Sequence, residues 1–365
     1  MKIECDKSKI EQSIQKAGRL ANKHLTLPVL SCVYLDAQNN KLIIKSTNLD
    51  IGIEIEIKVK TIENGIIAVP ANILLNTLAS IKENDLTFET EESNLKIYSN
   101  KNSFVIKCMS YEDFPSIPKL DNSKSIKINC HDFLFGFKSV WYSASTSNIK
   151  PELGSVYIYK GDNNLTFVST DSFRLAEKKI NIKNQIDFPQ TLIPYKNVLE
   201  IIKIFEDYKD DIEIIFEKNQ AAFMTKDITL VSRLVDGSFP DYKQIIPKEY
   251  VTTATVLKND LANSIKTSNI FSDSLNQVKI MVDVVNKSIN IESKNNDVGE
   301  YKESIKASVI GEDIELNFNN KYVIDCVQSI PSESLVLSFG GFGKPLVITG
   351  SSDKSFLYIV MPMNR

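Results

Sequence analysis

The strongest constraint on the fold of this chain is an internal repeat. The stretch NKLIIKSTNLDIG (40–52) aligns with NNLTFVSTDSFRL (163–175), and KSINIESKNNDVG (287–299) is a weaker third copy. The aligned residues are Leu42, Ser46, Thr47 and Asn48 with Leu165, Ser169, Thr170 and Asp171, a shift of 123, and then Ile289, Ser293 and Asn295 after a further 124. Chance similarity among Ile-rich strands is the alternative, but further landmarks recur in the same order. The pattern therefore predicts one structural plan built three times.

Each copy carries two helical patterns. The first lies at 6–18, 130–142 and 258–268. The second has apolar residues at i, i+1 and i+4, which places them on one helix face. These residues are Leu74, Leu75 and Leu78 in 69–81, Val198, Leu199 and Ile202 in 193–205, and Val323, Ile324 and Val327 in 318–330.

Strand patterns surround the helices. The clearest is IGIEIEIKVK (51–60), in which apolar and polar residues alternate. The first two copies close on Phe-Pro, at 114–115 and 239–240, and the third closes on Met-Pro at 361–362. We expect an α+β protein of three repeated domains, 1–121, 122–250 and 251–365. Each should contain two helices and mostly antiparallel sheets.

Composition limits the class of protein. A hydrophobic content of 42%, no apolar run long enough for a bilayer, and no apolar signal-peptide core predict a cytoplasmic protein without a membrane partner. Five scattered cysteines favour reduced thiols over a disulfide framework. The net charge of −3 means that any contact with DNA must come from local charge segregation.

The sequence predicts no enzyme, metal or cofactor. Two histidines, without a second ligand pair at metal spacing, are too few for most metal sites. The stretch GGFGKP (340–345) lacks the first glycine and the final Ser/Thr of a phosphate loop, so a glycine-rich hairpin turn is predicted. An acid-base pair of Asp171 and Arg174 is conceivable, but a turn capped by the aspartate is favoured.

Together these stretches resemble the bacterial DNA polymerase III beta subunit, the DNA sliding clamp, over the full length of the chain. The supporting motifs are TLPVL (26–30), STDSFRLA (169–176), SRLVDGSFPDYKQIIP (232–247) and YIVMPM (358–363). The resemblance implies a head-to-tail homodimer whose six domains close a ring around duplex DNA. Such a ring tethers the replicative DNA polymerase and confers processivity, and a separate clamp loader opens it.

The resemblance assigns DNA contacts to helices that line the ring. Sliding requires attraction to phosphates without base readout. The expected DNA-binding residues are Lys9, Lys16, Arg19, Lys23, His24, Ser147 and Lys196. In the first helix only Glu11 opposes these cations, and His24 stands where the family often has a basic residue.

The resemblance also implies a pocket for partner peptides that carry a Gln and one or two Leu/Phe anchors. These peptides belong to the polymerase subunit, the clamp loader and other proteins with a clamp-binding motif. Methionines suit such a pocket because they adapt to several partners. The expected pocket residues are Leu153, Thr170, Ser172, Phe173, Arg174, Leu175, Pro240, Ile245, Asn319, Tyr322, Pro345, Val360, Met361, Pro362 and Met363. We expect Thr170, Arg174, Asn319 and Tyr322 at a polar rim, and Ile359 and Phe356 in the strand core.

The seam of the ring is expected between the first domain of one subunit and the third domain of the other. Phe104 and Ile106, exposed on an edge strand, would meet Ile270 and Phe271 at the end of a helix. Lys101 or Lys107 would face Glu300 or Glu303. Two alternatives stay open: a hydrolase using Asp171 and Arg174, and a repeat-built protein-binding scaffold that never encircles DNA.

Overall fold

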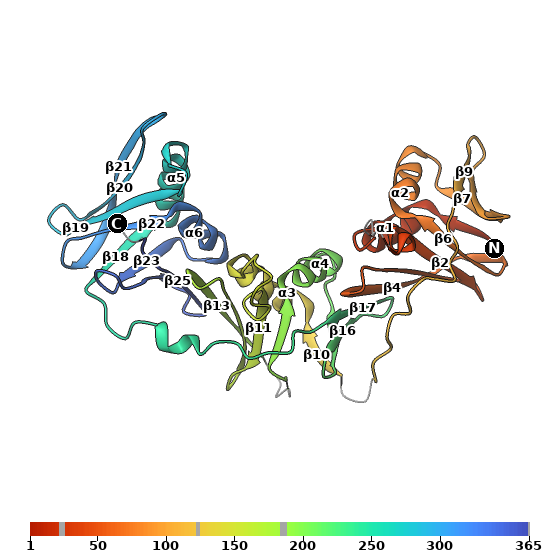
Figure 1. Ribbon diagram of the computed structural model, residues 1–365, viewed down its shortest axis with the longest axis horizontal. Coiled ribbons are helices and arrows are strands. Elements are labelled where there is room, and N and C mark those ends of the chain that lie inside the picture. The colour runs from red at the N-terminus through yellow and green to blue at the C-terminus, as the bar shows by residue number, and fades with distance from the viewer. Residues whose placement is uncertain (22–25, 122–124, 183–187, 364–365) are drawn as a thin grey trace. The chain divides into compact units, whose positions relative to one another are not determined.

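The computed structural model describes residues 1–21, 26–121, 125–182 and 188–363 (Figure 1). The predicted threefold plan is confirmed within these residues: each copy starts with a strand and a helix, continues with a run of strands and a second helix, and ends with three strands. The elements of the first copy are β1 (Lys2–Asp6), α1 (Lys7–Gly18), β2 (Cys32–Gln38), β3 (Lys41–Thr47), β4 (Ile51–Lys58), β5 (Lys60–Glu63), β6 (Gly65–Pro70), α2 (Ala71–Ser80), β7 (Asp85–Glu91), β8 (Asn94–Tyr98) and β9 (Ser103–Lys107).

The second and third copies repeat this order. The second contains β10 (Ile126–Asn129), α3 (Cys130–Val140), β11 (Ser155–Lys160), β12 (Asn164–Thr170), β13 (Arg174–Asn181), β14 (Thr191–Pro194), α4 (Tyr195–Phe205), β15 (Asp211–Phe216), β16 (Gln220–Met224) and β17 (Ile228–Arg233). The third contains β18 (Thr252–Leu257), α5 (Lys258–Ser268), β19 (Gln277–Asp283), β20 (Ser288–Asn295), β21 (Gly299–Gly311), β22 (Ile314–Asn319), α6 (Asn320–Asp325), β23 (Ser334–Phe339), β24 (Leu346–Gly350) and β25 (Phe356–Val360). Short 3-10 turns are η1 (Pro28–Ser31), η3 (Trp141–Ser143), η4 (Tyr242–Ile245), η5 (Asn269–Phe271) and η6 (Cys326–Ser329).

Helix starts and close packing follow from local chemistry. The Asp6 carboxylate accepts a hydrogen bond from the Lys9 backbone N–H at 3.1 Å and so caps α1. In α3, Gly136 lies against the Phe167 ring, and a Cβ there would come within 2.5 Å of that ring. The helix expected at 318–330 is shorter than predicted, because α6 ends at Asp325 and the chain continues as η6.

The chain divides into two compact units. Unit 1 comprises residues 1–131 and 199–234, and holds a five-stranded sheet (β5-β1-β7-β8-β9) and an eight-stranded sheet (β10-β15-β16-β17-β4-β3-β2-β6). Unit 2 comprises residues 132–198 and 235–365, and holds a twelve-stranded sheet (β14-β11-β12-β13-β25-β24-β23-β18-β21-β20-β19-β22). The strand pairs are antiparallel.

Two strand pairs join neighbouring copies of the repeat. The last strand of the second copy, β17, pairs with β4 of the first, with Leu230 opposite Ile53. The last strand of the third copy, β25, pairs with β13 of the second, with Leu175 opposite Ile359. The middle copy therefore contributes strands to a sheet in each unit.

The core consists of the inward faces of these strands and helices. Ile51, Ile53 and Ile55 are buried, as the alternation predicts, and Phe356 and Ile359 are strand core as expected. The five cysteines are free thiols, and Cys32, Cys130 and Cys326 are buried. None of the helices in the described part of the chain has the length and apolar character needed to cross a bilayer.

Candidate functional site

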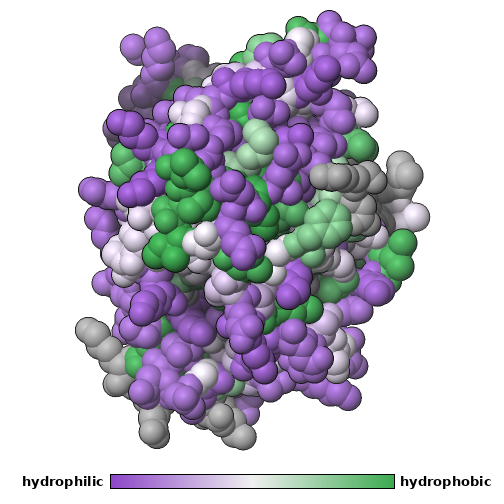
Figure 2. Space-filling model, turned by 90° about the vertical axis from the view of Figure 1, so that its left-hand side faces the viewer, coloured by the Kyte–Doolittle hydropathy of each residue, from purple (hydrophilic) through white to green (hydrophobic). Residues whose placement is uncertain are grey.

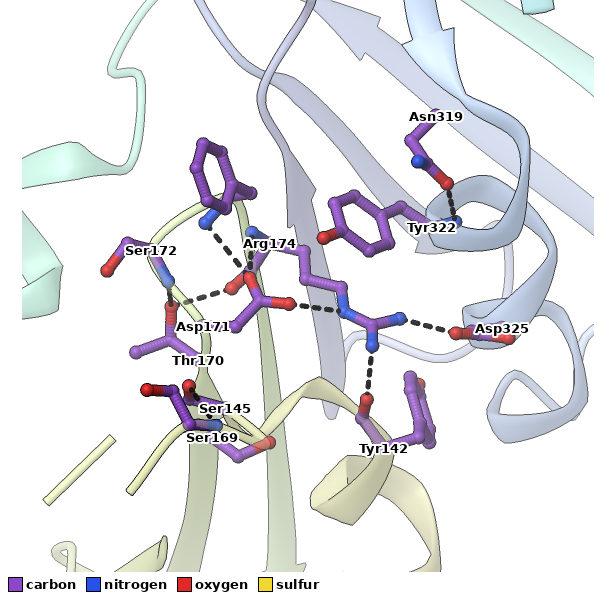
Figure 3. A network of polar contacts seen from close by, with 12 residues as sticks. Tyr142, Ser145, Ser169, Thr170, Asp171, Ser172, Arg174, Asn319, Tyr322 and Asp325 are labelled. Atoms are coloured by element: carbon purple, nitrogen blue, oxygen red, sulfur yellow. Dashed lines mark hydrogen bonds and ion pairs between the residues drawn. The ribbon is translucent and has the colours of Figure 1, made fainter. Parts of the chain in front are cut away.

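The turn between β12 and β13 is built around Asp171 (Figure 3). Its Oδ1 accepts hydrogen bonds from the backbone N–H groups of Phe173 and Arg174, at 2.9 and 3.0 Å. Ser172 adopts a positive φ of 79°, and the Thr170 hydroxyl donates to the Arg174 carbonyl at 2.6 Å. The predicted capped turn is confirmed, and it presents Phe173 to solvent.

Arg174 ties this turn to two other segments of unit 2 (Figure 3). Its Nε donates to Asp171 Oδ2 at 3.0 Å, Nη1 donates to Asp325 Oδ2, and Nη2 donates to the Tyr142 carbonyl at 2.6 Å. The guanidinium carbon also lies 4.4 Å from the centre of the Tyr322 ring. Burial alone would lower the pKa of Arg174, but Tyr358, Asp325 and Asp171 together raise it above its ordinary value.

Thr170 and Arg174, which were named for a polar pocket rim, bond mainly to the protein itself in this structure. The Arg174 side chain is only 12% exposed, and its donors are bonded inside the protein. Thr170 is buried, and its hydroxyl is bonded to the turn. Arg174 therefore holds three segments of the site together, and its place at the pocket rim stays a prediction.

The C-terminal tail crosses this region as a hydrogen-bonded segment. The Met361 N–H donates to the Phe173 carbonyl, and the Met363 N–H donates to the Asn317 carbonyl, both at 2.8 Å. Met361, Pro362 and Met363 stay half-buried, whereas Val360 is fully buried in β25. Val360 and Leu175 thus lie in the strand core, and Leu175 packs in a cluster with Val168, Tyr242, Val347 and Ile359.

The Phe239–Ile246 segment lies over the sheet and is held there by Tyr242. The Tyr242 hydroxyl donates to the Glu177 carboxylate and lies 2.8 Å from the Tyr159 hydroxyl. On the same segment, the Phe239 ring stacks on the Tyr157 ring, with 4.9 Å between the ring centres. Burial, and then the Glu177 carboxylate, raise the pKa of Tyr242, so the hydroxyl stays protonated and donates. This contact leaves Pro240 and Ile245 on the same segment exposed to solvent.

We expect Tyr242→Phe to lower the free energy of unfolding by about 1.5–3 kcal/mol, because a buried carboxylate loses a hydrogen-bond donor. Urea-induced unfolding measures this change. Tyr159→Phe is the matched control: it removes only the contact between the two hydroxyls and should cost about 1 kcal/mol. Equal losses for the two variants would contradict a dominant role for the bond to Glu177.

The remaining expected pocket residues lie in unit 2 in different environments. Leu153 is buried, Asn319 caps α6 by accepting the Tyr322 N–H at 3.3 Å, and Pro345 closes the predicted glycine-rich turn between β23 and β24. Sequence reasoning missed Leu275, an exposed side chain whose carbonyl accepts the Asn319 amide at 3.3 Å. No motif marks it, since it precedes a strand in an irregular loop.

The expected DNA-binding residues are brought together only in part. Lys9 and Lys196 are exposed on α1 and α4, Lys16 is half-buried, and Ser147 is exposed in the loop before β11. Arg19 forms a two-point ion pair with Glu200 of α4, with atom distances of 2.7 and 3.3 Å. Glu11 is therefore not the only acidic residue that opposes these cations. Lys23 and His24 lie outside the described residues.

The expected seam residues occupy strand β9 and the α5–β21 region. On β9, Ile106 is buried and Val105 is exposed, so the expectation of an exposed Ile106 is wrong; strand alternation turns Ile106 into the core. Phe104 is half-buried and Ile270 is exposed. The Phe271 ring stacks on the Tyr301 ring, with 6.2 Å between the ring centres. Glu300 and Glu303 are exposed on β21. Figure 2 shows hydrophobic side chains gathered between polar ones on the face that this part of unit 2 presents.

Three family models match the chain in order. The DNA polymerase III beta subunit N-terminal domain matches residues 1–118, the central domain 129–241 and the C-terminal domain 243–364. A protein named "Beta sliding clamp" from Staphylococcus epidermidis is 25% identical over 348 residues, which are 93% of this chain and 92% of that protein. The corresponding protein of Staphylococcus aureus is 24% identical over 349 residues, with the same coverage.

Solved structures share the fold. The DNA polymerase III beta chain of Streptococcus pneumoniae has a TM-score of 0.94 at 24% identity, covering 100% of both chains. The DNA polymerase sliding clamp of Bacillus subtilis also has a TM-score of 0.94 at 24% identity, covering 100% of this chain and 99% of that one. Because the three family models follow one another along almost its whole length, this chain belongs to the DNA polymerase III beta subunit family.

Proposed function

We propose that this protein is a DNA sliding clamp: a homodimeric ring that encircles duplex DNA and tethers the replicative polymerase to it. The observation that carries the proposal is the match of all three beta-subunit domains in order. The protein is a processivity factor, not an enzyme, and its place of action is the cytoplasm. The proposed domains are 1–121, 122–250 and 251–365; the family models cover 1–118, 129–241 and 243–364, so the third model begins eight residues before the last proposed boundary.

The internal repeat supports a head-to-tail dimer. Within the chain, the last strand of one copy pairs with an equivalent strand of the copy before it, as β17 does with β4 and β25 with β13. In the first copy the last strand is β9, which corresponds to β17 and β25. In the third copy the strand that corresponds to β4 and β13 is β21. Among the described residues, β9 pairs with β8 alone, and residues 299–306 of β21 pair with β20 alone. An antiparallel β9–β21 pair between subunits would extend the same rule and cover both edges.

The chemistry at these two edges is complementary. Lys101 lies two residues before β9, and Lys107 is the last residue of β9. Glu300 and Glu303 are exposed on β21. Val105 and Ile270 supply exposed apolar area that the seam would bury. Val105 replaces Ile106 in this proposal, because it is the exposed residue of β9.

DNA contact is proposed to be diffuse. Lys9, Lys16 and Lys196 would attract phosphates without reading bases, which permits sliding. The ion pair with Glu200 reduces the free charge of Arg19, so Arg19 is expected to contribute less than Lys9. Partner peptides from the polymerase subunit and the clamp loader would bind around Phe173, Pro240, Ile245, Leu275 and the Met361–Met363 tail.

Retention on DNA tests the proposal. After loading onto a nicked circular plasmid by the cognate loader, the protein should stay bound in moderate salt and dissociate once the circle is cut. Gel filtration of the DNA with labelled protein measures this retention. A strictly monomeric protein of 41.1 kDa at micromolar concentration, or loss from intact circles at the rate seen for linear DNA, would favour the protein-binding scaffold instead.

A further inference from the structure

An ion pair between α1 and α4 joins the first copy of the repeat to the second. Arg19 directly follows α1, where its charge suits the C-terminal end of the helix dipole. Its Nε donates to Glu200 Oε2 at 2.7 Å and its Nη2 donates to Glu200 Oε1 at 3.3 Å, so the carboxylate occupies one edge of the guanidinium. Both residues belong to unit 1. The contact is a two-point bond of the kind that a phosphate also forms with arginine.

Glu200 differs from the acidic residue of α1 in what it neutralises. Glu11 pairs with Lys7 of its own helix, with 3.5 Å between the charged atoms. Glu200 is the one acidic residue in the sequence of α4, and it reaches across to a cation of the first copy. Among the residues that the structure describes, Lys9 and Lys16 of α1 form no ion pair. Glu200 therefore removes a cation that would otherwise add to the free positive charge of these two lysines.

The pair is exposed enough to exchange partners. The Arg19 side chain is 39% exposed and the Glu200 side chain 25%. Ion pairs at such exposure contribute little to stability, because water competes for both charges. Leu20 and Ile201, the next residues along the chain, are buried, so apolar packing anchors both segments apart from the ion pair. A phosphate that approaches Arg19 can therefore displace the carboxylate at little cost to the fold.

We propose that Glu200 competes with DNA phosphates for Arg19 and so limits how tightly the protein holds duplex DNA. While the pair is closed, the guanidinium carries little free charge and the carboxylate repels phosphates. When a phosphate takes its place, Arg19 gains one charged contact and loses an equivalent one. The small net gain suits a ring that must slide. The inference rests on the proposed function, which assigns DNA contacts to α1 and α4.

The test measures binding of the full-length protein to a short labelled duplex by fluorescence anisotropy over a series of salt concentrations. Glu200→Gln keeps the shape of the side chain and removes its charge. It should tighten binding about fivefold at about 0.1 M salt and steepen the slope of log K against log salt by about one, as expected for one added phosphate contact. Arg19→Gln should cost at least about threefold more affinity in the Glu200→Gln background than alone, because only there is the guanidinium free.

Glu213→Gln is the matched control for the change in net charge. It also removes a carboxylate that pairs with a cation, Lys127 at 2.9 Å, but the pair joins strands β15 and β10 instead of two helices. This variant should change the affinity less than about twofold, because charges distant from the DNA are screened by salt.

Three results would overturn the role of Glu200 alone. These are an unchanged affinity in Glu200→Gln, an equal gain in Glu213→Gln, and equal losses for Arg19→Gln in the two backgrounds. If the unaltered protein showed no salt-dependent binding to the duplex, the proposed DNA contact would fail together with the role of Glu200.

Discussion

Replacing Arg174 with alanine is expected to lower the free energy of unfolding by about 3 kcal/mol, at the low end of the range for breaking a buried ion pair. The change leaves the carboxylates of Asp171 and Asp325 and the Tyr142 carbonyl without their donor. We take the low end because the Asp325 side chain is 35% exposed and can regain water. Urea-induced unfolding of the full-length protein measures the loss.

The same substitution should also abolish tight binding of partner peptides. Arg174 fixes the turn whose Phe173 carbonyl holds the Met361 N–H, so a loosened turn releases the tail that forms one side of the pocket. We expect at least a tenfold loss of affinity, in calorimetry, for a synthetic peptide that carries one Gln and a Leu-Phe pair.

Two control variants make the Arg174 prediction specific. Arg174→Lys keeps the charge but cannot reach three acceptors in a planar fork, so it should lose stability to an intermediate extent. Arg233→Ala removes a guanidinium whose ion pair with Asp50, at 3.9 Å, is 69% exposed on both sides, and it should cost well under about 1 kcal/mol. A loss for Arg174→Ala as small as that for Arg233→Ala would contradict the structural role.

Ile270→Asp is expected to raise the dissociation constant of the dimer by more than about a hundredfold, because the proposed seam would desolvate an unpaired carboxylate. Ile270 is 65% exposed in the single chain, so the monomer should lose less than about 0.5 kcal/mol of stability. Sedimentation across a dilution series measures the dissociation constant, and urea-induced unfolding checks the monomer.

Val285→Asp provides the matched control for the seam. Val285 is an apolar and even more exposed residue in the turn between β19 and β20. This turn lies at the Lys306 end of the proposed edge, whereas Phe271, next to Ile270, stacks on Tyr301 near its other end. Its replacement should leave the dimer mass unchanged at every concentration. An unchanged mass for Ile270→Asp, or dissociation in both variants, would contradict a seam at the end of α5.

Much of the fold could be predicted because the repeat appears in the sequence three times. The helix patterns and the alternation of 51–60 report burial on one face of one element, which is a local property. The wrong expectation for Ile106 concerns tertiary packing, which is not a local property. Its strand was correctly placed at an edge, but which face of SFVIK turns inward depends on the sheet and helices behind it.

The sequence by itself determined the repeated plan, the turn capped by Asp171 and the family, because these depend on residue order and local hydrogen bonding. The tertiary structure decided which of the named side chains are available. Thr170 and Val360 are buried in unit 2, and Arg174 bonds to Asp325, which is 151 residues away in the sequence, whereas Phe173 and Leu275 stay exposed. Burial depends on long-range contacts between segments, and a single sequence does not record which segments meet.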